Sequence, residues 1–199
     1  MHTVHKARAT MFGLSRHPGH YQGSSARIGA RLYRRIAADV AADVAAGRLP
    51  ATARILDAGT GPGLVPLQIA STSSELKIDA IDLSVEMIDH ARRQAITADV
   101  ADRITFTVAD IAALPYPDHT FDLIVSSLSQ HHWVDPAAGM SEIARVLRPG
   151  AEAWIYDFRF SLRRAQKAGQ AGSPALVVAK ESPLSGTSRL NPIGRLVLR

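Results

Sequence analysis

The sequence contains no cysteine among its 199 residues. This absence excludes disulfide bonds, thiolate zinc sites and every mechanism that needs a cysteine nucleophile. Long apolar runs are also missing: no stretch approaches the length of a membrane span, and residues 1–14 lack the apolar centre of a signal peptide. We therefore expect a cytoplasmic protein without a membrane span.

Positive charge is in moderate excess, with a formal net charge of +5. The positive side chains are mostly arginines spread along the chain, so we expect no nucleic-acid partner. A content of 46% hydrophobic and 21% charged residues suits one globular domain with a substantial core over residues 1–199. The oligomeric state stays open.

Apolar periodicity divides this domain into three parts. Over residues 25–47 apolar side chains recur every four positions, which predicts an amphipathic helix within a helical lead-in over residues 1–50. A core follows over residues 51–160. Residues 161–199 are expected to form a C-terminal helix, over 161–172, and a strand hairpin.

Strand-like and helix-like segments alternate along the core. Strands are expected over residues 54–58, 76–82, 104–108, 121–127 and 152–158, and helices over residues 63–70, 84–95 and 136–148. This alternation predicts an α/β fold: a Rossmann-like, doubly wound, mainly parallel sheet with a terminal antiparallel hairpin. Ligands of such sheets bind at the carboxyl ends of the strands.

The stretch ILDAGTGPG ends the first strand and continues with alternating glycines at 59, 61 and 63. A dinucleotide fingerprint needs its last glycine where Leu64 stands, and the Lys-Ser/Thr pair of a phosphate loop is absent. Asp57, at the strand end, opposes a phosphate but attracts an ammonium or sulfonium group. The loop therefore favours a cationic or zwitterionic ligand.

Two further acids end the next two strands. Asp82 can accept two hydrogen bonds from a ribose diol, and Asp110 can accept one from an exocyclic amine such as that of adenine. An aspartate at a strand end is common by itself. Three such aspartates at successive strand ends, together with the glycine loop, indicate a ligand that contains a nucleoside.

The chain resembles the class I S-adenosylmethionine-dependent methyltransferases. It is similar to the small-molecule enzymes related to ubiquinone and menaquinone biosynthesis methyltransferases. The resemblance covers residues 54–158 and lies in the segments ILDAGTGPG, IDLSVEMIDHAR, FTVADIAALPYPDHTFDLIVSSLSQHHW and EIARVLRPGA. It implies that the cofactor is S-adenosylmethionine, bound by the core.

The resemblance also implies where each part of the cofactor binds. The methionine portion is expected to contact Asp57, the loop residues Gly59, Thr60, Gly61 and Gly63, and Ser126 and Ser127 after the fourth strand. The ribose is expected at Asp82. The remaining contacts, to adenine and adenosine, are expected from Asp110, the backbone of Ile111, Leu83 and Met87.

Two adjacent histidines, His131 and His132, follow the fourth strand near the expected methyl group. One of them could act as a general base, or one could bind backbone or cofactor while the other is exposed. Tyr21 in the lead-in could cover the methionine end of the cofactor, or be an ordinary packing residue. Positioning of the acceptor in a desolvated pocket supplies most of the catalysis in either case.

Several acceptors are disfavoured. Cytosine C5 methylation needs a cysteine adduct, and SSLS stands where amino methyltransferases carry Asn/Asp-Pro-Pro-Tyr/Phe. Residues 126–160 contain no cluster of acids, so we expect no metal site there. An oxygen, nitrogen, sulfur or carbon atom of a small-molecule acceptor remains. Two alternatives stay open: an NAD(P)-dependent oxidoreductase and a catalytically silent S-adenosylmethionine-binding module.

Overall fold

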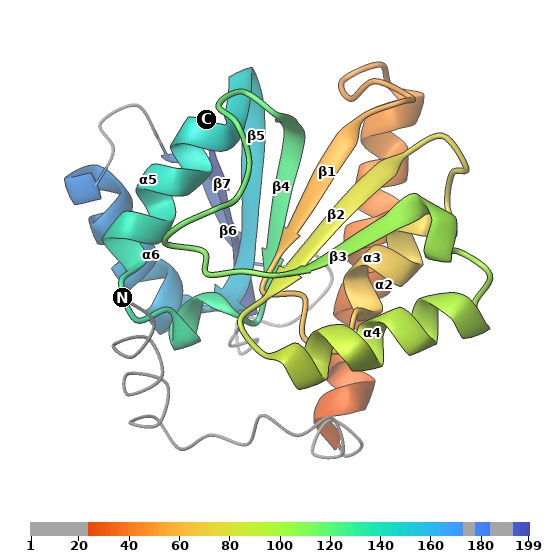
Figure 1. Cartoon of the computed structure of the whole chain (residues 1–199). Coiled ribbons are helices and arrows are strands. Elements are labelled where there is room, and N and C mark those ends of the chain that lie inside the picture. Colours follow the sequence, from red (N-terminus) through yellow and green to blue (C-terminus); the bar gives the residue numbers. More distant parts are fainter. Residues whose placement is uncertain (1–23, 173–177, 184–192) are drawn as a thin grey trace.

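The computed structural model describes residues 24–172, 178–183 and 193–199, and within them it contains a seven-stranded sheet (Figure 1). The strand order is β3-β2-β1-β4-β5-β7-β6. In chain order the strands are β1 (Arg54–Ala58), β2 (Lys77–Asp82), β3 (Ile104–Val108), β4 (Phe121–Ser127), β5 (Leu147–Phe158), β6 (Val178–Pro183) and β7 (Ile193–Leu198).

The first five strands are parallel, and β7 pairs antiparallel with both β5 and β6. The predicted α/β fold, with a mainly parallel sheet and a terminal antiparallel hairpin, is therefore confirmed. Because β1 has β2 on one side and β4 on the other, the chain reverses its direction across the sheet between these strands. In doubly wound folds the ligand crevice opens at this point.

Helices cover both faces of the sheet, as Figure 1 shows. One face packs against α2 (Ser24–Ala45), α3 (Leu64–Ala70) and α4 (Val85–Thr97). The other packs against α5 (Pro136–Val146) and α6 (Arg159–Gly172). Two short 3-10 helices, η2 (Ala101–Arg103) and η3 (Gln130–His132), complete the described elements.

The predicted starts of α4 and α5 are confirmed, but α6 begins at Arg159 and not at residue 161, and the predicted end of α5 is wrong. Ser84 accepts from the Met87 N–H and starts α4, and Asp135 accepts from the Ala138 N–H before the proline that opens α5. The expected helix end at Pro149 and Gly150 comes too late, because α5 ends at Val146 and β5 begins at Leu147. A proline disfavours helical backbone in the residue before it, which supports the earlier end.

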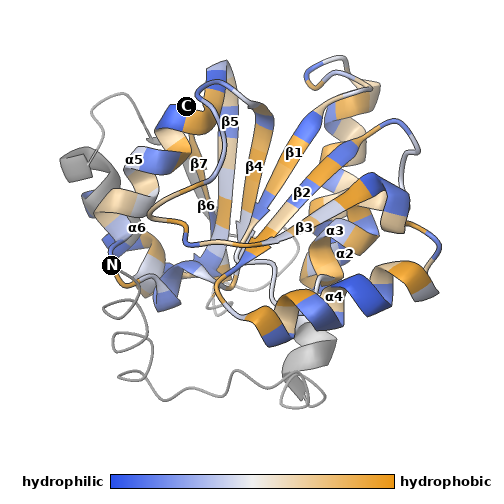
Figure 2. Cartoon of the chain, viewed as in Figure 1, coloured by the Kyte–Doolittle hydropathy of each residue, from blue (hydrophilic) through white to orange (hydrophobic). Residues whose placement is uncertain are grey.

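Apolar strands form the core, and Figure 2 shows the hydrophobic residues gathered along the central strands. Successive residues of β1 alternate between the faces: Ile55 packs on the α2 side and Leu56 on the α5 side. The predicted amphipathic helix is confirmed by the buried Leu32, Ile36 and Val40 of α2. None of the helices within the described ranges has both the length and the hydropathy needed to span a bilayer.

Candidate functional site

The glycine loop after β1 is tied to the end of β2. The N–H groups of Gly59 and Thr60 both donate to the Ile81 carbonyl, at 2.9 and 2.8 Å. The Gly61 N–H donates to Asp82 Oδ2 at 2.8 Å, and the Ser84 N–H donates to Asp82 Oδ1 at 2.9 Å. Asp82, the predicted ribose ligand, therefore also fixes the loop beside which a ligand would lie.

Two glycines of the loop have left-handed backbone and no space for a side chain. Gly59 has φ 77°, and a Cβ there would lie 1.8 Å from Ser129 Oγ, beyond the end of β4. Gly63 has φ 83°, and a Cβ there would lie 2.7 Å from the Ala91 Cβ on α4. Gly63 thus allows close helix packing, and Gly59 allows the loop after β1 to touch the loop after β4.

Asp57, near the end of β1, is a buried acid without a hydrogen-bonding partner in the described part of the chain. Burial raises the pKa of its carboxyl group from 3.8 to about 7, the nearby Thr60 hydroxyl opposes this shift, and the charge of Asp82 adds to it. A buried carboxyl group in this condition gains from a cation placed beside it.

Unpartnered buried oxygen atoms are concentrated at the neighbouring ends of β1 and β4. Six such side-chain atoms occur in the described residues, and five of them lie at the β1 and β4 ends: Asp57 Oδ1 and Oδ2, Thr60 Oγ1, Ser126 Oγ and Ser127 Oγ. Asp57 pairs with Val125, so the two serines continue β4 just past it. Buried polar atoms in folded proteins usually have partners, so this set fits a polar ligand that carries both donors and acceptors.

The predicted adenosine residues lie at the ends of β2 and β3. Leu83 is 49% exposed, which is high for an apolar side chain, whereas Met87, on the first turn of α4, is buried. Asp110 Oδ1 accepts from the Ala112 N–H at 2.9 Å and shapes the turn that contains Ile111. Parallel strand ends therefore bring these residues to the same edge as the glycine loop.

His131 is held by an acid that the sequence analysis missed. Its Nδ1 lies 2.8 Å from Asp157 Oδ1, and its backbone N–H donates to Asp157 Oδ2 at 3.1 Å. Asp157, on β5, is fully buried and also accepts from the Phe158 N–H at 2.7 Å. Because the carboxylate can only accept, Nδ1 carries a proton and Nε2 is the atom able to accept another. The signal that the sequence offers for this residue is a single acid, Asp157, within the apolar segment WIYDF.

His132 has a different environment from its neighbour. The two imidazole centroids lie 3.9 Å apart, and the pKa of His132 is lowered, first by burial and then by the adjacent His131. No acid is hydrogen-bonded to its ring in the described residues. The structure thus separates the pair into an oriented histidine, His131, and an exposed one, His132.

Two further predictions concern Tyr21 and the absence of a metal site. Tyr21 lies outside the described residues. Among the residues that are described, no three His, Asp or Glu side chains lie close enough together to hold a metal ion.

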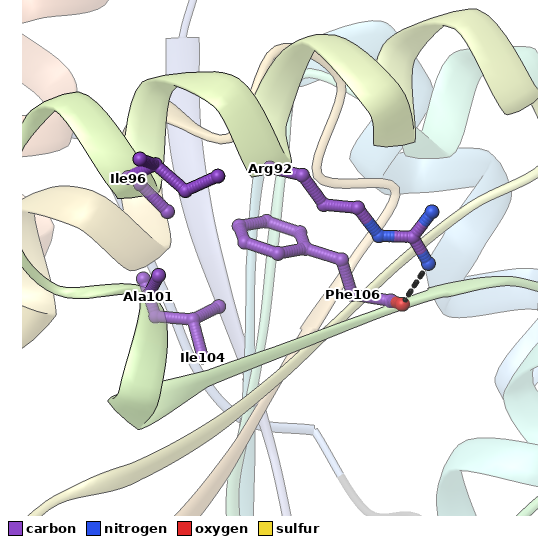
Figure 3. A pocket seen from close by; sticks show the side chains of 6 residues that line it. Arg92, Ile96, Ala101, Ile104 and Phe106 are labelled. Atoms are coloured by element: carbon purple, nitrogen blue, oxygen red, sulfur yellow. Dashed lines mark hydrogen bonds between the residues drawn. The ribbon is translucent and has the colours of Figure 1, made fainter.

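A cavity of about 270 Å³ lies elsewhere, between α4 and β3 (Figure 3). Its lining is mainly apolar, and Arg92 at its side donates from Nη2 to the Phe106 carbonyl at 2.7 Å. None of the predicted site residues lines it; the lining consists of Arg92, Ala95, Ile96, Ala101, Ile104 and Phe106. The cavity is therefore distinct from the strand-end site.

The family described as "Methyltransferase domain" matches residues 55–150. This range contains the glycine loop, the three strand-end acids and both histidines. Residues 55–150 of the chain are therefore similar to a methyltransferase domain. Members of this family use S-adenosylmethionine, so the match favours this cofactor and sets aside the NAD(P)-dependent oxidoreductase.

Relatives of the methyltransferase domain support the assignment. The chain is 39% identical over 115 residues to a 27-O-demethylrifamycin SV methyltransferase of Amycolatopsis mediterranei, a match that covers 57% of the chain and 42% of the relative. It is also 39% identical over 106 residues to a ubiquinone/menaquinone biosynthesis C-methyltransferase of Geobacter sulfurreducens, over 53% of the chain and 41% of the relative. The matched segment thus spans less than half of either relative.

Solved structures support the fold of the methyltransferase domain. A methyltransferase from Aquifex aeolicus, named as dependent on S-adenosylmethionine, superposes with a TM-score of 0.65 at 19% identity. The superposition covers 74% of the chain and 81% of that structure. At this identity the likeness shows the fold alone.

Proposed function

We propose that the chain transfers a methyl group from S-adenosylmethionine to an oxygen, nitrogen, sulfur or carbon atom of a small-molecule acceptor. The observation that carries this proposal is the set of unpartnered oxygen atoms around the buried Asp57. When bound, S-adenosylmethionine supplies a methyl group activated by a positively charged sulfur. The family match and the relatives support the same activity.

The residues at the strand ends fit the parts of this cofactor. Asp57 would face the positive charge of the methionine portion, with Thr60, Ser126 and Ser127 as the polar lining. Asp82 would accept from the ribose hydroxyls through lone pairs that Gly61 and Ser84 leave free, because a carboxylate offers about four acceptor positions. Asp110 and the Ile111 backbone would contact the adenine, with Leu83 and Met87 beside it.

His131 is proposed as the general base for acceptors that must lose a proton. Its Nε2 would take the proton as the acceptor atom bonds to the methyl carbon, and the carbon–sulfur bond breaks in the same displacement. Asp157 keeps Nδ1 protonated and stabilises the imidazolium that forms. His132, which is exposed and has no such partner in the described residues, is proposed to contact the His131 ring without acting as a base.

Three earlier expectations remain proposals. Tyr21 is proposed to cover the methionine end of the cofactor from the lead-in, and residues 1–199 are proposed to form one domain. The cytoplasmic location stays a prediction.

A turnover assay tests the proposed function and separates it from a silent binding module. The full chain is incubated with methyl-labelled S-adenosylmethionine and a panel of phenols, amines, thiols and carbon acids, and label in the products is measured. We expect transfer to at least one class, with formation of S-adenosylhomocysteine. Tight cofactor binding without transfer to any acceptor would favour the silent module instead.

A further inference from the structure

A line of aromatic rings leads from the two histidines onto α6. The His131 ring, which contacts His132 on one side, lies 5.4 Å from the Phe158 ring, measured between centroids. The Phe160 ring stacks on Phe158 at 5.7 Å, with 11° between the ring planes. The line therefore joins the proposed general base to the start of α6.

Phe160 ends this line at the surface of the molecule. Its side chain is 65% exposed, although it is large and apolar. The next two residues, Ser161 and Leu162, are buried, and the Ser161 hydroxyl donates to Gln130 Oε1 on η3. This contact fixes the first turn of α6 beside the histidines and leaves the Phe160 ring facing outward. An aromatic ring held in this way offers a flat apolar contact.

Positive charge follows one helical turn after Phe160. Residues three, four and seven positions later share its side of the helix, and these are Arg163, Arg164 and Lys167, all exposed. The α6 sequence contains no acid. None of the ion pairs formed among the described residues includes these three side chains. Within the described residues their charges are therefore available to an anionic ligand.

We propose that the acceptor is an aromatic compound with an acidic group, and that Phe160, Arg163 and Arg164 bind it. This inference rests on the proposed function. The acceptor's ring packs beside the line of rings that runs from His131 to Phe160, and its carboxylate, sulfonate or phosphate pairs with an arginine one turn along α6. A guanidinium suits such groups because it can donate two parallel hydrogen bonds. The atom to be methylated then points back toward His131.

The first measurement compares two probes that differ only in charge. The full chain, saturated with S-adenosylhomocysteine, is titrated with 3-hydroxy-2-naphthoate and with the neutral 3-hydroxy-2-naphthamide. We expect the acid to bind about tenfold more tightly than the amide, and the difference to shrink as salt is raised. Equal binding of the two probes would overturn the role of the arginines.

Variants then locate the binding site. Phe160→Ala should weaken both probes by about tenfold, because both lose the ring contact. Arg163→Gln and Arg164→Gln should each weaken only the acid, by about threefold to tenfold. Two exposed residues of α4 provide matched controls, Ile96→Ala for the phenylalanine and Arg93→Gln for the arginines, and neither should change either affinity.

The outcomes distinguish this inference from the proposed function. If S-adenosylhomocysteine binds but neither naphthalene probe does, the acceptor class is wrong while the cofactor assignment stands. If Phe160→Ala behaves like Ile96→Ala, the aromatic contact is wrong. Failure of S-adenosylhomocysteine itself to bind would overturn the proposed function, and this inference with it.

Discussion

The Nδ1 atom of His131 lies 2.8 Å from the carboxylate of Asp157, a residue 26 positions later in the chain. The contact joins η3, after the fourth strand, to the end of β5. It leaves Nε2 as the proton acceptor, and it gives the buried Asp157 carboxylate a ring N–H in addition to two backbone N–H donors. The orientation of the His131 ring therefore depends on a carboxylate and not on its histidine neighbour.

Replacement of Asp157 by Asn should lower kcat by about a hundredfold or more for an acceptor that loses a proton, because the ring then lacks its fixed tautomer. His131→Gln should have a similar effect, and the double variant should be little worse than either single variant, since the two residues act as a unit. His132→Gln should lower kcat much less than either of these single variants. The measurement is steady-state kinetics on all four variants, with cofactor affinity determined in parallel.

Normal turnover in Asp157→Asn and His131→Gln would remove general-base catalysis by this pair and leave positioning of the acceptor as the main mechanism. A parallel loss of cofactor affinity would instead indicate a structural role for the contact.

Asp57→Asn should stabilise the ligand-free protein at high pH. The folded-state pKa of this carboxyl group is raised to about 7, so between pH 3.8 and 7 the native state binds more protons than the unfolded state. The contribution of this carboxyl group to the free energy of unfolding therefore falls as pH rises through that range. Above about pH 7 the full destabilisation from the buried charge is present. Asparagine removes this titration, and the gain at pH 8 should be on the order of 2 to 4 kcal/mol, or about 5 to 10 °C in Tm.

Thermal unfolding of wild type and Asp57→Asn from pH 4 to pH 8 tests this expectation. The two curves should converge at the acid end, and the variant should bind S-adenosylmethionine at least tenfold more weakly. Asp102→Asn is a matched control, because the Asp102 side chain is 83% exposed and its replacement should shift neither curve. A constant difference in Tm across this pH range would show that Asp57 is not the titrating group.

Gly59→Ala should destabilise the fold by about 3 kcal/mol or more, since it adds backbone strain to a collision with Ser129. The double variant Gly59→Ala with Ser129→Gly removes the collision and should recover part of this loss. Gly47→Ala is the control: its φ is 69° but no atom lies within 4 Å of the added Cβ, so only strain remains. Chemical denaturation of the four proteins gives the comparison, and equal losses in Gly59→Ala and Gly47→Ala would refute the close contact.

Asp82→Ala should weaken binding of S-adenosylhomocysteine by about tenfold to a hundredfold, the loss expected for a hydrogen bond to a charged group. Because Asp82 also accepts from Gly61 and Ser84, part of this loss comes from the loop. Titration with the 2′-deoxy analogue separates the two parts, since the variant should lose less affinity for a ligand without that hydroxyl. Equal losses for both ligands would assign Asp82 to the loop alone. Asp89→Ala on α4, where the Asp89 side chain is 49% exposed, is the control and should not change the affinity.

Much of the fold and of the candidate cofactor site follows from local patterns in the sequence. Alternating strands and helices require parallel neighbours, and parallel strands end at one edge, so the sequence alone predicts that Asp57, Asp82 and Asp110 lie at one edge of the sheet. The helix end near Pro149 was misplaced, because the punctuating Pro-Gly pair belongs to a strand that begins two residues before the proline.

The contacts that the sequence could not predict are long-range. Asp157 lies in an apolar strand, and no local pattern tells which loop its carboxylate will meet. Ser129 approaches Gly59 from a loop 70 positions later, so the steric need for that glycine depends on tertiary packing. The same limit applies to Phe160, which lies between a predicted strand and a predicted helix and has no local signal that indicates its exposure or its ring contacts.

Calorimetric titration of the full chain with S-adenosylmethionine, S-adenosylhomocysteine and NAD tests the central claim most directly. The account predicts that the first two bind at one site in the micromolar range and compete with each other, with no binding of NAD at the same concentrations. It also predicts a higher Tm whenever either ligand is in excess. Absence of heat and of a thermal shift with both S-adenosyl ligands, or NAD binding as tight as theirs, would contradict it.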